Sequence, residues 1–160
     1  MARRIEIKVP HLPATKTLYT VNDTPIGTGK KLNNQRTADV QLVQFFLSQF
    51  YAKHPELFRQ LAPTKNGRFL IDGDCGAQTK SGIWVYQTWE QKRGKQIHPD
   101  GVIDPPNAYV SPSGRNTYTI LLLNEWFLDN GTGTEHFSKL ENHPDLRGAT
   151  ALRAELGTPR

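Results

Sequence analysis

One stretch, residues 72–87 with the sequence DGDCGAQTKSGIWVYQ, constrains the fold of this chain more than any other. Its Asp72-Gly73 pair and Gly76 are typical of a tight turn, because glycine adopts positive φ and an aspartate side chain accepts hydrogen bonds from nearby backbone amides. At about 100° per residue, one side of a following helix carries Thr79, Ile83, Tyr86 and Glu90. The stretch predicts a closed turn leading into a helix over residues 77–92, with Gly82 and Gln87 flanking the buried side and Trp84 opposite.

Two further stretches show the spacing of buried helices. The first runs from Thr37 or Asp39 to about Tyr51, and its apolar stripe consists of Val40, Val43, Phe46, Leu47 and Phe50. The second, residues 117–128, is apolar nearly all round, which predicts that more than one of its faces is covered. Short helical turns are expected near residues 55–61 and 144–156. The pattern as a whole predicts a mainly α protein.

These residues also carry a resemblance to a known family. The DGxxGxxTxxAVxxFQ signature of the small three-helix peptidoglycan-binding domain, which accompanies many cell-wall hydrolases, is similar to this chain at Asp72, Gly73, Gly76, Thr79, Ile83 and Gln87. Gly82 replaces the alanine of the signature and Tyr86 its phenylalanine. The VxxLQxxL pattern of that family's first helix resembles Val40, Val43, Gln44 and Leu47, and Asp100-Gly101 resembles the turn before its third helix.

The resemblance implies a three-helix, peptidoglycan-binding-domain-like core over residues 37–128, with a basic N-terminal arm (1–36) and a C-terminal extension (129–160). Two long loop insertions, residues 51–69 and 105–116, lie where the family has shorter connections. The residues expected to build the turns and their contacts, as structural rather than ligand-binding groups, are Asp72, Gly73, Gly76, Thr79, Gln87, Asp100 and Gly101.

The formal charge of +5 is concentrated at the N-terminus. Residues 1–36 hold seven lysines and arginines against two acidic residues, so the other 124 residues are neutral overall. A nucleic-acid-binding protein is expected to carry its basic surface on the folded body, and we therefore expect no nucleic-acid partner. Ile5, Ile7 and Val9 alternate with polar residues and predict a short edge strand in this arm. The arm is either a solvated tail or a tether to an anionic surface or partner.

The sequence predicts neither a membrane span nor a classical signal peptide. No apolar run approaches the ~20 residues of a membrane helix. The basic start of the chain is not followed by the apolar stretch of a secretory signal. We expect a protein made in the cytoplasm that would reach a cell wall only by lysis or by a dedicated secretion apparatus.

No pattern in the sequence predicts catalysis, a metal or a cofactor. The five histidines are expected in loops, because they lie far apart and form no HExxH pair: His11, His54, His98, His136 and His143. Asp72 and Asp74 do not complete a calcium loop, since Gly76 occupies the place of the third acid. Cys75, the single cysteine, is expected to be a small buried side chain, and it would be a nucleophile only if a histidine approached it in space.

Two functions are compatible with these features. The first is a non-catalytic module that anchors a partner or assembly on peptidoglycan or another wall polymer through aromatic and polar groups; the candidate ligand-binding residues are Trp84, Arg115, Asn116 and Tyr118. The structural alternative is that Trp84 packs under an insertion and Tyr118 belongs to the core. The second function is a structural or adaptor protein of a phage or contractile injection apparatus, with a protein partner bound through residues 1–36 or 129–160.

Overall fold

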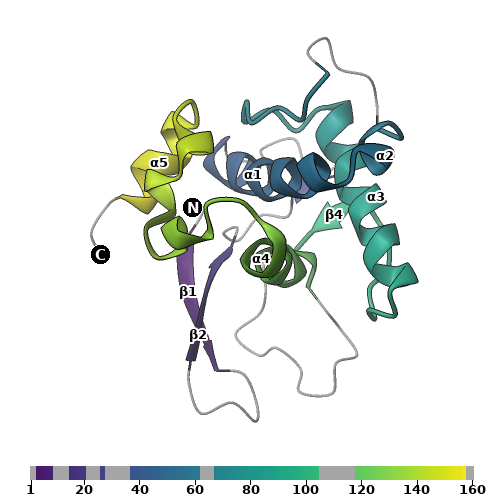
Figure 1. The fold of residues 1–160 in the computed structure, drawn as a ribbon, viewed down its shortest axis with the longest axis horizontal. Coiled ribbons are helices and arrows are strands. Elements are labelled where there is room, and N and C mark those ends of the chain that lie inside the picture. The colour runs from purple at the N-terminus through teal and green to yellow at the C-terminus, as the bar shows by residue number, and fades with distance from the viewer. Residues whose placement is uncertain are drawn as a thin grey trace.

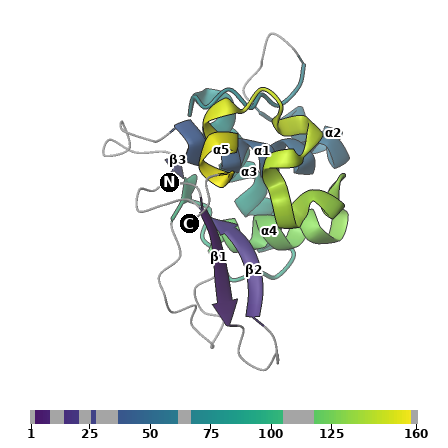
Figure 2. The ribbon, with the colours of Figure 1, turned by 90° about the vertical axis from the view of Figure 1, so that its left-hand side faces the viewer.

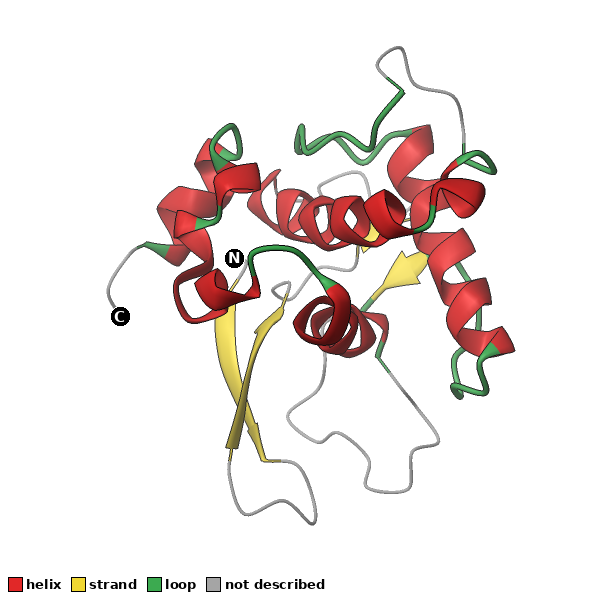
Figure 3. Ribbon diagram, viewed as in Figure 1, coloured by secondary structure: helices red, strands yellow, loops and turns green. Residues whose placement is uncertain are grey.

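The computed structural model describes residues 3–8, 15–20, 26–27, 37–61, 67–104 and 118–157. Most of them are helical, which confirms the mainly α class (Figure 1; Figure 3). The helices are α1 (Thr37–Lys53), α2 (Pro55–Phe58), α3 (Ala77–Lys92), α4 (Thr119–Asn130) and α5 (Thr150–Leu156), with the 3₁₀ helices η1 (Thr134–Asn142) and η2 (Pro144–Leu146). Within the described ranges, no helix has both the length and the apolar character needed to cross a bilayer.

Helix α1 is the centre of the molecule (Figure 1). It contacts α2, α3, α4 and α5, and every residue from 38 to 47 is buried. The apolar stripe predicted from the sequence accounts for only one side of this helix. The other sides bury polar residues, among them Gln41, Gln44 and Gln49. Because buried amides must form hydrogen bonds, each glutamine defines a place where another segment is attached to α1.

Two short sheets complete the fold. Strand β1 (Arg3–Lys8) pairs antiparallel with β2 (Thr15–Thr20), and β3 (Ile26–Gly27) pairs antiparallel with β4 (Val102–Ile103). The expected edge strand is thus one half of a hairpin, which projects below the helices (Figure 2). Its Tyr19 is buried, and the backbone N–H and C=O of Tyr19 bond the side-chain amide of Asn124 in α4, both at 2.8 Å.

Residues of the N-terminal and C-terminal segments belong to the same hydrophobic core as α1. Tyr19 and Ile26 precede α1 in the sequence, whereas Leu140, Leu146 and Leu152 follow α4, and all five are buried. On the C-terminal side, the backbone N–H of Leu152 in α5 donates to the Gln41 side chain at 2.9 Å. The segments predicted as an arm and an extension therefore help to cover α1 and α4.

The first Asp-Gly turn is held by Gln44 of α1. Its Oε1 accepts the backbone N–H of Gly73 at 2.8 Å, and its Nε2 donates to Asp72 Oδ1 and to the carbonyl of Asp74, both at 2.9 Å. Nε2 also donates to the hydroxyl of Thr79 in α3 at 3.0 Å. Within the turn, Asp72 Oδ1 accepts the N–H of Asp74, and Gly73 has φ of +80°, a conformation that favours glycine.

The second Asp-Gly turn repeats this arrangement with Gln87 of α3. Gln87 Oε1 accepts the N–H of Gly101 at 2.8 Å, while Nε2 donates to the Asp100 carboxylate, the Val102 carbonyl and the hydroxyl of Thr119 in α4. Asp100 Oδ1 accepts the N–H of Val102, and Gly101 has φ of +73°. In each turn, one buried glutamine attaches a loop, and the helix that follows this loop, to the helix that carries the glutamine. We call each of these two turns a corner.

The buried face of α3 agrees with the sequence prediction. Ile83, Tyr86, Glu90 and Thr79 are buried, and Trp84 on the opposite side is half exposed. Gly82 allows close approach, since a Cβ there would lie 2.8 Å from the ring of Phe69, and the Gly82 carbonyl accepts the hydroxyl of Tyr51. The space beside Gly82 is therefore occupied by the ring of Phe69, from the loop before α3, and by Tyr51 of α1.

We expect Ile83→Ala to lower the free energy of unfolding by about 2–4 kcal/mol, because it removes a fully buried side chain and leaves a cavity. Trp84→Ala, one residue along α3, is the matched control and should change stability by less than about 0.5 kcal/mol, since its side chain is half exposed. Urea unfolding of the two variants measures the difference. Equal losses would contradict the register of α3.

We expect Gln44→Glu to destabilise the protein by about 3 kcal/mol or more. The change removes the amide donor and places a second carboxylate beside Asp72, inside a buried hydrogen-bond network. Gln78→Glu is the control, because the Gln78 amide is less buried and its Oε1, which accepts the N–H of Leu70, is retained. A loss no larger for Gln44→Glu than for the control, measured by thermal or urea unfolding, would show that the corner does not hold the fold.

Candidate functional site

Two hollows with a partly apolar lining adjoin each other beside α1. They measure about 480 and 300 Å³, and both are lined by Ser48 and Ala52 of α1 and by Arg68 and Phe69 of the following loop. Together they form a groove, here called the α1 groove, between α1 and the segment 67–72. Open grooves with apolar walls and a few polar groups are common binding surfaces.

Phe69 forms the floor of the α1 groove. Its ring stacks on Tyr51 with centroids 5.5 Å apart and planes 12° from parallel, over the space left by Gly82. The side-chain amide of Gln78 attaches the segment to α3, since it accepts from the N–H of Leu70 at 3.1 Å and donates to the carbonyl of Arg68 at 3.3 Å. The loop wall of the groove is therefore fixed by hydrogen bonds and ring packing.

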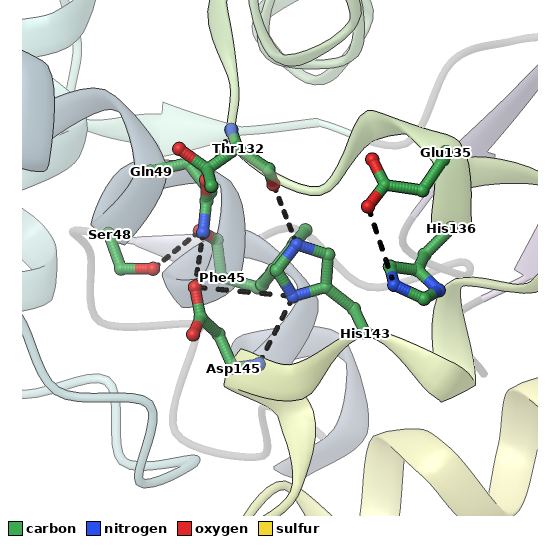
Figure 4. A network of polar contacts seen from close by, with 8 residues as sticks. All are labelled: Phe45, Ser48, Gln49, Thr132, Glu135, His136, His143 and Asp145. Carbon is green, nitrogen blue, oxygen red and sulfur yellow. Dashed lines mark hydrogen bonds and ion pairs between the residues drawn. The ribbon is translucent and has the colours of Figure 1, made fainter.

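One end of the α1 groove is acidic. Asp145 and Asp72 both line it, and Asp145 Oδ2 accepts the side-chain amide of Gln49 at 2.6 Å (Figure 4). Gln49 Oε1 in turn accepts the N–H of Thr132 at 3.0 Å. Gln49 thus places the Asp145 carboxylate at the groove mouth, as Gln44 places Asp72. The two carboxylates would favour a ligand group that is positively charged or rich in hydrogen-bond donors.

His143 lies behind Asp145, in a connection between helices as the sequence predicted, and its side chain is buried (Figure 4). It occupies the short connection between η1 and η2, and its ring packs on Phe45 with centroids 4.8 Å apart. Its Nε2 donates to the carbonyl of Thr132 at 2.7 Å, and its Nδ1 accepts the N–H of Asp145 at 3.1 Å. Both ring nitrogens are therefore engaged in holding the start of η2.

Ser48 and His143 do not form a nucleophile and base. The Ser48 hydroxyl donates to the carbonyl of Phe45 at 2.7 Å, and the bonds of His143 leave no ring nitrogen to accept the serine proton. The signal that could have identified the structural role of His143 is local. It precedes Pro144-Asp145, where a side chain that accepts the N–H two residues on caps a helical turn.

The residues predicted to bind ligand are only partly placed by the structure. Trp84 is 50% exposed on α3. Tyr118 is half buried at the N-terminus of α4 and packs against the core, as the structural alternative held in part. Arg115 and Asn116 lie outside the described residues. The structure therefore gives positions for Trp84 and Tyr118 alone, and ligand binding by either residue stays a prediction.

Trp84 and the α1 groove lie on different sides of α3. Gly82 faces the groove floor, and a side chain two residues later is rotated by about 200° around the helix axis. Trp84 is flanked on its own side by exposed Lys80 and half-buried Thr88, whose hydroxyl bonds the Trp84 carbonyl. The protein thus offers two separate surfaces, an aromatic one on α3 and the α1 groove.

Cys75 is half buried in the first corner, directly before α3. Burial raises the pKa of its thiol above the ordinary value, and the nearby charge of Lys80 offsets part of this effect. The described residues contain no cluster of three or more His, Cys, Asp or Glu side chains arranged to hold a metal ion. The surroundings of Cys75 thus favour the protonated thiol over the thiolate.

Comparisons with known proteins found no match to this chain among protein-family models, curated proteins or solved structures. The resemblance to the peptidoglycan-binding domain therefore depends on the residues themselves and on the two corners that they build.

We expect Cys75 to react slowly with iodoacetamide at pH 7.5, at least about fivefold slower than a free thiol such as glutathione. The thiolate is the reacting form, and burial both raises the thiol pKa and limits access. Mass spectrometry over time measures the modification, and the urea-unfolded protein serves as the control. Alkylation in the folded state faster than in glutathione would identify an activated cysteine instead.

Proposed function

We propose that this protein is a non-catalytic module that binds peptidoglycan and anchors a partner or assembly at a bacterial wall. The proposal is supported mainly by the paired corners. The signature residues Asp72, Gly73 and Thr79 are joined by Gln44 in a single network, so their pattern has a structural cause. The proposed finer fold is a peptidoglycan-binding-domain-like core of α1, α3 and α4, enlarged by the terminal segments.

The proposed contact surface is centred on Trp84. An exposed indole offers an apolar face on which a sugar ring can stack, and Lys80 and Gln91 on the exposed side of α3 can bond hydroxyl and N-acetyl groups. Tyr118 precedes Thr119, which is bonded to Gln87 one turn along α3 from Trp84. We include Arg115 and Asn116 in the proposed surface because they closely precede Tyr118 in the chain.

An adaptor protein of a phage or contractile injection apparatus is the second candidate. The observation that favours it is the meeting of the two terminal segments, since α5 contacts β1 (Figure 2). A partner could then bind residues 1–36 and 129–160 on one surface. In this function the chain would bind a protein and not the wall.

We expect Trp84→Ala to reduce binding to purified sacculi at least about fivefold at ~0.5 M salt. Stacking is short-ranged, whereas attraction between exposed charges is screened beyond about 4–5 Å at this ionic strength. Trp84→Phe, which keeps an aromatic face, should retain part of the binding. Co-sedimentation with sacculi measures both variants, after circular dichroism has established that they are folded.

A deletion of residues 1–36 is not a suitable test of the basic arm, because it would also remove Tyr19 and Ile26 from the core. The triple change Arg3→Gln, Arg4→Gln and Lys8→Gln lowers the charge instead. It should weaken binding in dilute buffer only. If binding disappears with these charges and is unchanged in Trp84→Ala, wall affinity is electrostatic. Absence of binding by the unmodified protein would favour the adaptor function.

A further inference from the structure

A third, much smaller hollow lies between the end of α3 and α4. It measures about 80 Å³, and its charged and aromatic lining includes Glu90, Arg93, Lys95, Glu125, Trp126 and Asp129. At roughly 30 Å³ for each water molecule, it has room for two or three small polar groups. We call it the Glu90 cleft.

Glu90 is the unusual residue of this cleft. It is 2% exposed, and its Oε1 accepts the hydroxyl of Tyr86 at 2.8 Å. Its Oε2 is buried and has no hydrogen-bond partner among the residues that the structure describes. The nearest cationic group, Nη1 of Arg93, is 3.8 Å away, too far for a hydrogen bond, and the Arg93 guanidinium instead lies 4.3 Å from the ring centroid of Trp89.

Oε1 of Glu90 is engaged by the Tyr86 hydroxyl. Burial and the neighbouring Glu90 carboxylate raise the pKa of Tyr86 well above its ordinary value, so its hydroxyl remains a donor across the whole physiological range. Oε2, on the side of Arg93, is therefore the carboxylate oxygen that can accept a hydrogen bond from a ligand. A buried carboxylate oxygen without a donor is unfavourable, and a ligand that supplies an N–H would relieve this deficit.

The charges at the mouth define what else the ligand carries. Exposed Arg93 and Lys95 supply positive charge, and exposed Glu125 and Asp129 supply negative charge. A divalent cation is disfavoured, because Arg93 and Lys95 would repel it and the described residues provide no ligand cluster for a metal. A ligand with both charges, placed side by side, matches the lining.

We propose that the Glu90 cleft binds the head group of an amino acid, with the ammonium directed to Glu90 Oε2 and the adjacent carboxylate to Arg93 and Lys95. An ammonium and a carboxylate on one carbon fill a space of this size. This site is independent of the Trp84 surface, and it would give a wall-binding module a contact to a peptide branch that bears a free amino-acid head group.

Titration followed by NMR tests the site with three probes of related structure. The first, 2,6-diaminopimelic acid, carries both groups, whereas cadaverine carries only ammonium groups and pimelic acid only carboxylates. We expect the first probe to bind with a Kd of about 1–5 mM, as a ligand of so few contacting atoms allows, and to shift the amide signals of Glu90 and Lys95. The other two should bind at least about tenfold more weakly.

Glu90→Gln removes the charge at Oε2 and keeps the acceptor for Tyr86, so it should weaken binding of diaminopimelic acid by at least about tenfold. Glu56→Gln, on exposed α2, is the matched control and should have no effect. Lys95→Ala tests the carboxylate contact at an exposed position, and decides the question if Glu90→Gln does not fold. Equal binding of cadaverine and diaminopimelic acid, or unchanged binding in both cleft variants, would overturn the proposal.

Discussion

This structure depends on a buried side-chain amide whose oxygen and nitrogen both form hydrogen bonds to one backbone turn. Gln44 and Gln87 each accept the N–H of the turn glycine and donate to the aspartate and to a carbonyl of the same turn. Each also donates to a threonine of the next helix. Helix α3 carries the threonine of the first corner and the glutamine of the second. The same contact, repeated, therefore attaches α1 to α3 and α3 to α4.

This arrangement separates structural from functional residues. Asp72 and Asp100 each commit one carboxylate oxygen, Oδ1, to their own turn, so the pattern of these two residues has a structural cause. What remains for recognition is the half-exposed Trp84, the α1 groove with its Asp145 end, and the Glu90 cleft. Each of these surfaces offers a different chemistry: an apolar ring face, an acidic groove and a small cleft of mixed charge.

The sequence predicted what local periodicity and turn chemistry determine. The bounds of α3, its buried face and the exposure of Trp84 follow from helical spacing, and the corner residues follow from the Asp-Gly pattern. The burial of Gln41 and Gln49 did not, because a glutamine on a helix resembles a solvated residue until its distant partners, Leu152, Thr132 and Asp145, are known. Long-range contacts of this kind leave no local pattern, and the same holds for the contact of Tyr19 with Asn124.

Hydrogen exchange at the two turn glycines tests the central claim most directly. Loop amides usually exchange rapidly, but the N–H groups of Gly73 and Gly101 each donate to a buried glutamine oxygen at 2.8 Å. The account predicts that both amides exchange as slowly as those in the middle of α1 and α3, since the corners should open only when the helices separate. Exchange of either amide at the rate of an unstructured peptide would contradict it.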